Sequence, residues 1–292
     1  MSSLRRVVLL LVFVLALVSA AFSQLAQIYI ANENQSNLEL LKFNPTQLTT
    51  LYNIGAKPDD MTINSAGQLL YTVPNLGTVQ LYDPNTGIDR VVASGIMYAR
   101  DLAIEAGGKT MLVAKYTGPA EIIRLNLTTG AQTVLVGKAA KLGTCDGIAY
   151  DGYGNLYAVA NHNTIVQVNP TTGAIIATLV LETHSGVNGA DGLTWDPSTQ
   201  SLWATHDGKN LGTGLLQIFV KESGFLSTTS TGFTFYPLAG ITNVDGIKSD
   251  GLGNLYVAAI YDALVYNIPT HKIIQTVVTK GADGIALVPG TY

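Results

Sequence analysis

Six short segments of the chain each begin with an aspartate that is followed by apolar residues, and in four of them the second residue is glycine. They start at Asp60, Asp101, Asp146, Asp191, Asp245 and Asp283. Carboxylate oxygens are hard ligands that favour Ca²⁺ or Mg²⁺, and Ca²⁺ tolerates the irregular geometry of loops. Converging carboxylates also repel one another unless a cation or hydrogen bonds compensate them. If the fold brings these aspartates together, they form a candidate calcium site.

The spacing of the segments indicates which fold positions them. Successive starts are 41, 45, 45, 54 and 38 residues apart, which matches one four-stranded propeller blade. In the clearest copy we expect strands at Asp146–Asp151, Leu156–Ala160, Thr164–Val168 and Ala174–Val180. The sequence therefore predicts an all-β, six-bladed propeller of four-stranded antiparallel blades, with six equivalent carboxylates at one end of the central axis.

The two ends of the chain complement each other. Asp283–Val288 holds only the first strand of a blade, whereas strands expected at Gln27–Ala31, Glu39–Phe43 and Leu48–Ile54 supply the other three. Joining both termini in one blade closes the ring and removes an open sheet edge. We expect a single domain over residues 24–292.

The first residues read as a secretory signal peptide. Arg5-Arg6 precede the apolar run Val7–Val18, and small residues follow, with Ser23 as the preferred last residue of the signal peptide, 1–23. The mature chain is then secreted, extracellular or periplasmic, without stable membrane insertion, and we expect a monomer. An uncleaved membrane anchor is the alternative.

Composition excludes several classes of function. The net charge of −4 leaves no basic surface for nucleic acid. Cys145 is the only cysteine, so an intrachain disulfide is impossible. No Gly-x-Ser-x-Gly elbow, His-Glu-x-x-His motif or phosphate loop is present, so nucleophilic serine chemistry has no support.

Loops that join second and third strands should share the face of the aspartates, because two strands return the chain to the same end. These loops carry Glu33, Lys115, His162, His206 and Tyr261, and a long connection adds His184. A histidine there is a candidate general base, because its pKa lies near neutrality. We expect this mouth to bind a small molecule or carbohydrate. The candidate substrate-binding residues are Asp101, Lys115, His162, His184 and Tyr261. The second aspartates of three copies are expected to be structural: Asp151, Asp196 and Asp250.

The segments Asp191–Asp196 and Asp245–Ala258 resemble the blade signature of the gluconolactonase/senescence-marker-protein family. Other six-bladed propellers share the motif, including NHL-repeat proteins, paraoxonases and diisopropyl fluorophosphatase. The resemblance implies a calcium ion at the mouth, held by an asparagine and an aspartate that precede the signature glycines and by a glutamate. On this chain Asp191 takes the place of the asparagine and Asp245 that of the aspartate. The family's Glu-Gly-Pro start is absent, so Asp283 or Asp60 would replace its glutamate.

Three hypotheses about function remain open. The first is a calcium-dependent hydrolase of a lactone or ester, in which Asp146 activates water, with His206 as second choice; the resemblance places Asp146 near substrate or metal. The second is a non-catalytic binding propeller for protein or carbohydrate. The third is a lyase resembling the seven-bladed streptogramin B lyases, against which the six copies argue. A fold alone does not decide between enzyme and binder.

Overall fold

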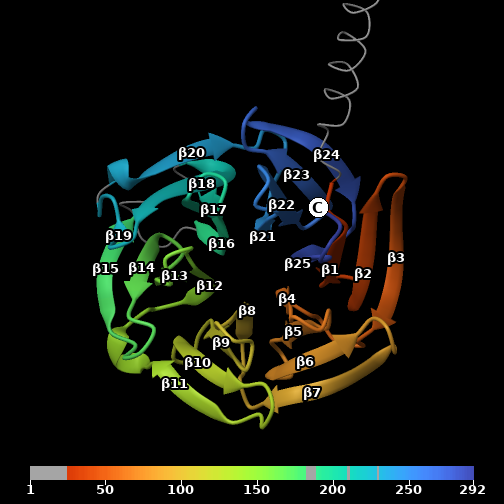
Figure 1. The fold of residues 1–292 in the computed structure, drawn as a ribbon, viewed down its shortest axis with the longest axis horizontal. Helices are drawn as coiled ribbons and strands as arrows, with labels where there is room; N and C mark the ends of the chain where they lie inside the picture. The colour runs from red at the N-terminus through yellow and green to blue at the C-terminus, as the bar shows by residue number, and fades with distance from the viewer. Residues whose placement is uncertain (1–24, 182–188, 209–210, 229) are drawn as a thin grey trace, which may run out of the picture.

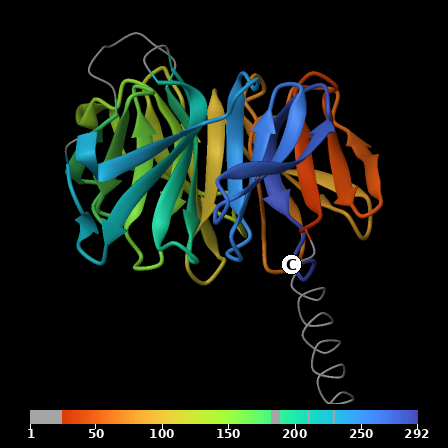
Figure 2. The same cartoon turned by 90° about the horizontal axis from the view of Figure 1, so that it is seen from above.

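A computed structural model describes residues 25–181, 189–208, 211–228 and 230–292. The expected signal peptide, 1–23, and His184 lie outside the described residues. Six small antiparallel sheets surround a central axis, as Figure 1 shows, so the predicted six-bladed propeller is confirmed. Seen edge-on in Figure 2, the strands run between the two faces of a disc.

The blades are numbered here from 1 to 6, and their strands are given from the axis outwards. Blades 1 and 2 consist of β25 (Ala282–Leu287), β1 (Ile28–Asn32), β2 (Asn37–Phe43) and β3 (Thr46–Asn53), and of β4 (Met61–Ile63), β5 (Leu69–Val73), β6 (Thr78–Asp83) and β7 (Ile88–Ser94). Blades 3 and 4 consist of β8 (Ala99–Ile104), β9 (Thr110–Lys115), β10 (Glu121–Asn126) and β11 (Gln132–Val136), and of β12 (Cys145–Tyr150), β13 (Leu156–Ala160), β14 (Thr164–Val168) and β15 (Ile175–Val180). Blades 5 and 6 consist of β16 (Ala190–Asp196), β17 (Ser201–Gly208), β18 (Gly212–Lys221) and β20 (Phe233–Pro237), with β19 (Gly224–Phe225) also paired to β18, and of β21 (Val244–Ser249), β22 (Asn254–Ala259), β23 (Asp262–Asn267) and β24 (Lys272–Val278).

Helical structure in the described part of the chain is limited to two 3₁₀ turns, η1 (Lys138–Ala140) and η2 (Ser230–Gly232). No helix within these residues is long and apolar enough to cross a membrane.

The core lies between blades rather than within one sheet. Every residue of β13 is buried, and Tyr157 packs in one cluster with Leu202 of blade 5. An outer strand packs on the rest of its blade with one side and faces solvent with the other. In β24, and in β15 from Ile176 onwards, exposed residues therefore alternate with half-buried or buried ones. The strands expected at Leu156–Ala160 and Thr164–Val168 are confirmed to the residue as β13 and β14.

The termini close the ring as predicted. β1 pairs antiparallel with β25, with Ile28 opposite Leu287 and Ile30 opposite Ile285. All four of these side chains are buried in the cluster between blades 1 and 6. The chain therefore has no free inner edge in blade 1.

Blade 5 explains the longest spacing between copies. β18 first turns back as the short strand β19, and the outer strand β20 follows only after η2. Lys221 pairs with Gly224 at the turn that joins β18 to β19, and this extra hairpin lengthens the copy.

The glycine of each Asp-Gly pair allows neighbouring inner strands to approach closely. A Cβ atom added to Gly192 would lie 2.5 Å from the carbonyl oxygen of Asp245 in the next blade. The same clash, at 2.3–2.5 Å from the next blade's aspartate carbonyl, faces Gly147, Gly246 and Gly284. Thr205 Oγ1 strengthens the contact, since it accepts from the amide of Gly192 at 2.8 Å and donates to the carbonyl of Asp245 at 2.5 Å.

We expect Gly192→Ala to destabilise the ring, because backbone opposes the new methyl group and blades 5 and 6 must separate. Over-packing of this kind costs about 1–3 kcal/mol, which lowers Tm by roughly 3–10 °C in calorimetry. Gly137→Ala is the matched control, since its φ is −96° and the nearest atom to a Cβ is 3.4 Å away. Equal Tm values for the two variants would contradict the close approach.

Candidate functional site

The strand registers correct the alignment of two copies. In blade 4 the register of the inner strand shifts at Asp146-Gly147, and in blade 3 the same shift falls at Arg100-Asp101. Arg100 is therefore equivalent to Asp146, and Asp101 to Gly147. In blade 2 the carbonyl that faces Gly284 belongs to Asp59, so Asp59 rather than Asp60 holds the equivalent position.

The expected ring of six equivalent carboxylates is thus wrong at two positions. The observed mouth ring consists of five aspartates and one arginine: Asp59, Arg100, Asp146, Asp191, Asp245 and Asp283. Asp60 and Asp101 sit one residue further along, at the level of the signature glycines, and line the narrow channel below. The cause is that blades 2 and 3 lack the glycine that marks this position in the other four blades.

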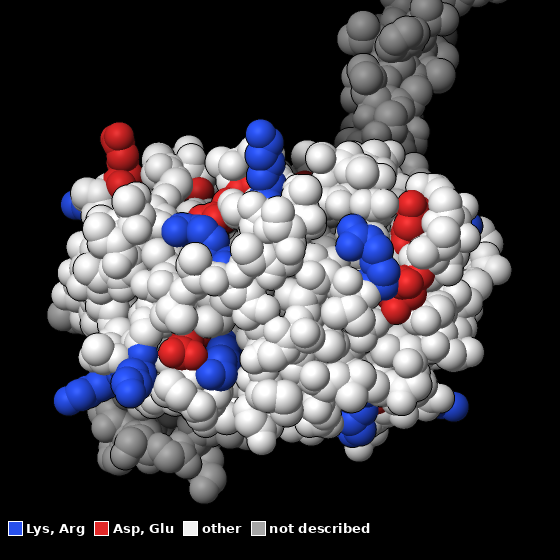
Figure 3. Space-filling model, turned by 90° about the horizontal axis from the view of Figure 1, so that it is seen from below, with Lys and Arg blue, Asp and Glu red and all other residues white. Residues whose placement is uncertain are grey.

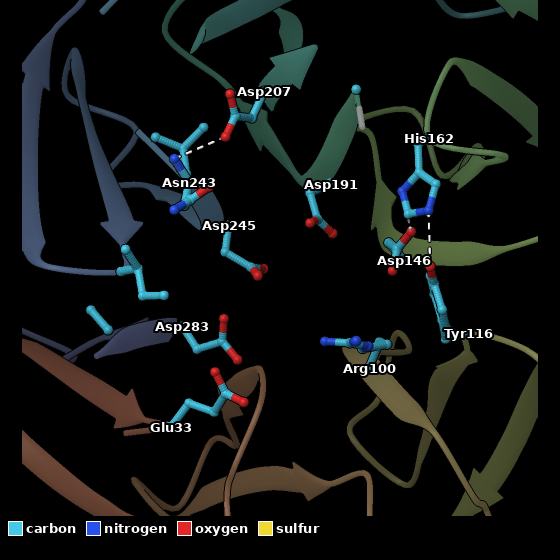
Figure 4. Close-up of a pocket in the computed structure, with 14 residues that line it drawn as sticks. Glu33, Arg100, Tyr116, Asp146, His162, Asp191, Asp207, Asn243, Asp245 and Asp283 are labelled. Carbon is cyan, nitrogen blue, oxygen red and sulfur yellow. Dashed lines mark hydrogen bonds and ion pairs between the residues drawn. The ribbon is translucent and has the colours of Figure 1, made fainter. Parts of the chain in front are cut away.

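The mouth ring opens into a cavity of about 320 Å³. Its wall includes Glu33 and Asp207 in addition to most of the ring. Figure 4 shows the carboxyl groups of Asp191, Asp245 and Asp283 around the open centre, with Arg100 on the facing side. The side of the disc in Figure 3, by contrast, carries only scattered charged side chains on a largely uncharged surface.

Arg100 compensates one part of the ring. Its Nη1 pairs with Asp59 Oδ2, and its guanidinium lies 5.0 Å from the centre of the Tyr116 ring. Its buried Nε has no hydrogen-bond partner among protein atoms. The guanidinium side chain is about one-third exposed, at 35%, so it faces both the ring and the cavity.

Lys248 compensates the channel below. Its Nζ lies 3.2 Å from Asp60 Oδ2 and 3.5 Å from Asp101 Oδ1. Burial lowers the pKa of Lys248, but the two carboxylates raise it by a larger amount. The pKa therefore lies above its ordinary value, and the ammonium group stays charged. Asp101 also accepts the amides of Leu102 at 2.6 Å and, across the blade boundary, of Ile148 at 2.7 Å. Compensation of the deep carboxylates is partial, since Asp60 Oδ1 has no hydrogen-bond partner within the described residues and burial raises the pKa of Asp101 well above its ordinary value despite Lys248.

The carboxylates of the mouth ring are also incompletely compensated. Burial, followed by repulsion from neighbouring aspartates, raises the pKa of Asp191 and Asp283 well above the ordinary range. Burial also raises the pKa of Asp245. For Asp59, burial raises the pKa to about 8 although Arg100 lowers it. The mouth therefore favours uptake of positive charge, as protons or as a cation.

Of the residues expected in the loops between second and third strands, Glu33 and His162 lie on the cavity wall. His162 Nδ1 lies 3.1 Å from Asp146 Oδ2, and its Nε2 lies 3.0 Å from the hydroxyl of Tyr116. Asp146, expected as a metal ligand or base, is therefore in contact with an imidazole, as the dashed lines of Figure 4 show.

Three other expected residues are not on the wall. His206 is fully buried, with Nδ1 2.9 Å from the carbonyl oxygen of Gly212 and its ring against Phe235, so it has no access to the cavity. Lys115 pairs with Glu121 at 3.0 Å. Tyr261 is 61% exposed and lies outside the lining.

The second aspartates are structural, as expected. Asp151 accepts the amides of Tyr153 at 2.8 Å and Asn155 at 2.9 Å, which closes the turn after β12. Asp250 makes the equivalent turn in blade 6, and Asp196 accepts the amide of Thr199 at 2.8 Å.

The donor chemistry of the mouth fits a hard divalent cation. Asp191, Asp245 and Asp283 supply carboxylate oxygens of raised pKa that face one cavity. Within the described residues, however, no three acidic, histidine or cysteine side chains already have the arrangement of a metal site. Cation binding at this mouth thus requires these carboxylates to draw together.

Sequence reasoning missed Arg100, Lys248, Asp59 and Tyr116. The first two had a signal in the sequence, since Arg100 precedes an aspartate in a copy without glycine and Lys248 stands where blades 3 and 4 carry Ala103 and Ala149. A lysine at an inner-strand position where the other copies carry only alanine or threonine requires a buried partner.

We expect Lys248→Met to destabilise the protein strongly, because it leaves Asp60 and Asp101 buried without their cation. Loss of one partner of a buried pair costs about 3–5 kcal/mol, visible as a lower midpoint in urea unfolding. Lys57→Met is the control, since Lys57 pairs with Glu33 at the surface and is 51% exposed. A wild-type midpoint for Lys248→Met would show that Lys248 is not the counter-ion.

The raised pKa values predict that stability falls with rising pH. Asp59 has an ordinary pKa of 3.8 and a folded pKa of about 8, so the folded state holds more protons than the unfolded chain between these values. The unfolding free energy therefore decreases with pH in that window. In the presence of chelator, we expect a higher Tm at pH 5 than at pH 8, measured by calorimetry. A Tm that rises over this range would contradict the assignment.

No protein-family model matches the chain, and no curated protein matches it. Solved structures do. A chain in a nidogen–laminin complex is 14% identical, with a TM-score of 0.69 over 90% of this chain and 98% of that one. A gluconolactonase from Xanthomonas campestris is 13% identical, with a TM-score of 0.66 over 90% and 88%. A virginiamycin B lyase from Staphylococcus aureus is 15% identical, with a TM-score of 0.58 over 88% and 84%. At these identities, the likeness establishes a shared propeller fold.

Proposed function

We propose that the mouth binds a divalent cation, calcium first, and that the protein hydrolyses a lactone or ester there after secretion. The observation that carries this proposal is the charge on the cavity wall. Among the described lining residues, the carboxylates are Glu33, Asp146, Asp191, Asp207, Asp245 and Asp283, whereas the basic groups are Arg100 and His162.

Asp191, Asp245 and Asp283 would hold the ion. Asp207 is the least suited, because its carboxylate already accepts the amide of Asn243 at 2.9 Å and the hydroxyl of Thr213 at 2.7 Å. A bound divalent cation supplies Lewis acidity toward a carbonyl oxygen.

The residues of the chain supply the remaining functions. Arg100 offers N–H groups to an oxygen of the ligand from the side opposite the aspartates. His162 and Tyr116 lie on the wall beside Arg100 and provide groups that transfer protons. A cavity of about 320 Å³ suits a small molecule rather than a polymer segment. Similarity to a gluconolactonase is consistent with a small cyclic ester.

We expect calcium to raise Tm and a chelator to lower it, since a ligand of the folded state alone stabilises that state. At a calcium concentration of 100 Kd the gain is about 2.7 kcal/mol, or roughly 5–10 °C. Asp245→Asn together with Asp191→Asn should abolish this response in differential scanning fluorimetry.

Asp151→Asn is the matched control, because Asp151 lies at the opposite end of an inner strand and closes a turn. That variant should melt earlier but retain the calcium response. A response that persists in the double variant would place the ion elsewhere. Turnover is then tested on sugar lactones, aryl esters and organophosphates, each with calcium and with chelator.

The alternative function is a non-catalytic binding propeller for a protein or carbohydrate. It is favoured by Lys248 and Arg100, which already compensate part of the carboxylate charge without an ion. Calcium binding without turnover of any substrate in the panel would favour this alternative.

A further inference from the structure

Three side chains lie in a row along one wall of the mouth, joined by one close contact and one hydrogen bond. Asp146 Oδ2 lies 3.1 Å from His162 Nδ1, and His162 Nε2 lies 3.0 Å from the Tyr116 hydroxyl. Asp146 is on the inner strand β12, His162 follows β13 and Tyr116 follows β9. The row therefore connects the mouth ring of blade 4 with a loop of blade 3.

The backbone holds His162 in place at a conformational cost. Asn161 and His162 both have positive φ, at 52° and 59°, which is uncommon for residues other than glycine. The carbonyl oxygen of His162 accepts the amide of Ala190 from blade 5 at 2.5 Å. A Cβ on the neighbouring Gly189 would lie 2.0 Å from that oxygen, so only glycine permits the contact. Strained backbone fixed by surrounding contacts occurs preferentially at functional sites.

The partners of the imidazole set its tautomer. An ionised carboxylate has no donor, so the 3.1 Å approach of Asp146 Oδ2 favours the tautomer with its proton on Nδ1, although the contact is not aligned as a hydrogen bond. In the neutral imidazole Nε2 is then the acceptor, and the Tyr116 hydroxyl donates to it. The direction of the row is therefore from Tyr116 through His162 to Asp146.

Tyr116 stands where a substrate can reach it. It lines the mouth cavity and also a neighbouring recess of about 340 Å³, which shares Glu33 and Arg100 with the mouth. The guanidinium of Arg100, 5.0 Å from the ring centre, places a positive charge beside the phenol. His162 itself has both ring nitrogens engaged, so the phenolic oxygen is the end of the row that faces a ligand.

We propose that Tyr116 is the acid–base residue of this mouth, and that His162 and Asp146 are positioning residues that move and balance its proton. The inference rests on the proposed hydrolase function. It also reassigns Asp146, expected from the sequence to act on water directly, to a role behind His162.

In the proposed step, water forms a bond to the carbonyl carbon of the ester or lactone. The water proton passes to the Tyr116 oxygen while the Tyr116 hydroxyl proton moves to His162 Nε2, and the resulting imidazolium faces Asp146. When the bond between carbon and the leaving oxygen breaks, Tyr116 donates its proton to that oxygen and recovers one from Nε2. The products are a carboxylic acid and an alcohol, water is the only co-reactant, and no group is oxidised.

The kinetic test compares Tyr116→Phe with the wild type on aryl and alkyl esters whose leaving alcohols differ in pKa. We expect kcat to fall by at least about 100-fold on alkyl esters with little change in KM, the usual scale for a lost acid–base group. The loss should be smaller for p-nitrophenyl esters, because that leaving group departs without a proton. A merely structural role would lower all rates equally. Tyr153→Phe is the matched control, an exposed tyrosine outside the cavity lining, in the turn that Asp151 closes.

A second measurement tests the row without turnover. ¹⁵N NMR of the imidazoles, with His162 identified from the signal lost in His162→Gln, should show the Nδ1–H tautomer, and Asp146→Asn should reduce its population. An Nε2–H tautomer in the wild type overturns the proposal.

The possible failures are distinguishable. If the wild type hydrolyses a substrate and Tyr116→Phe keeps more than half of kcat on every ester, the role of Tyr116 is wrong while the hydrolase function stands. If the wild type hydrolyses nothing, the hydrolase function fails and the catalytic role of Tyr116 fails with it.

Discussion

The close approach of neighbouring inner strands is the constraint on which the rest of the structure depends. At four blade boundaries a glycine lies against the carbonyl of the next blade's aspartate, with no room for even a methyl group. Six blades must close into one ring, so any separation at a boundary widens the whole circle. Tight contacts keep the axis narrow, and a narrow axis forces the side chains beside each glycine to converge.

Convergence brings mutually repelling carboxylates together at two levels, in the channel and at the mouth. In the channel, where water is scarce, Lys248 pairs with Asp60 and Asp101. One level higher, Arg100 pairs with Asp59 alone. At the mouth, Asp191, Asp245 and Asp283 face the cavity, and burial raises their pKa values. Burial also raises the pKa of Asp101 in the channel well above its ordinary value. The two basic side chains thus compensate only part of the converging charge at either level, and protons or ions can supply the rest.

The fold was predictable because its signals are local and repeated. Apolar second and third strands, turn residues and the split blade led to β13, β14 and the pairing of β1 with β25. The site was predictable only in outline. Asp101 aligned well by sequence, yet a one-residue shift puts Arg100 in the ring, because a missing glycine moves the bulge. His206 was expected in a loop at the mouth, but it lies within β17 and its side chain is buried in the core. The direction in which a side chain points depends on bulges and on packing between blades, and the periodicity of the sequence does not encode either of them.

The substitution of Arg100 for one aspartate also removes the rotational symmetry of the opening. A propeller with six like charges presents the same potential to a ligand in any of six orientations. Here blade 3 contributes positive charge while blades 5, 6 and 1 contribute negative charge across the same small space. The resulting field is lateral, so a polar molecule in this opening would have a preferred orientation about the axis. The two ends of such a molecule would then meet walls of opposite charge.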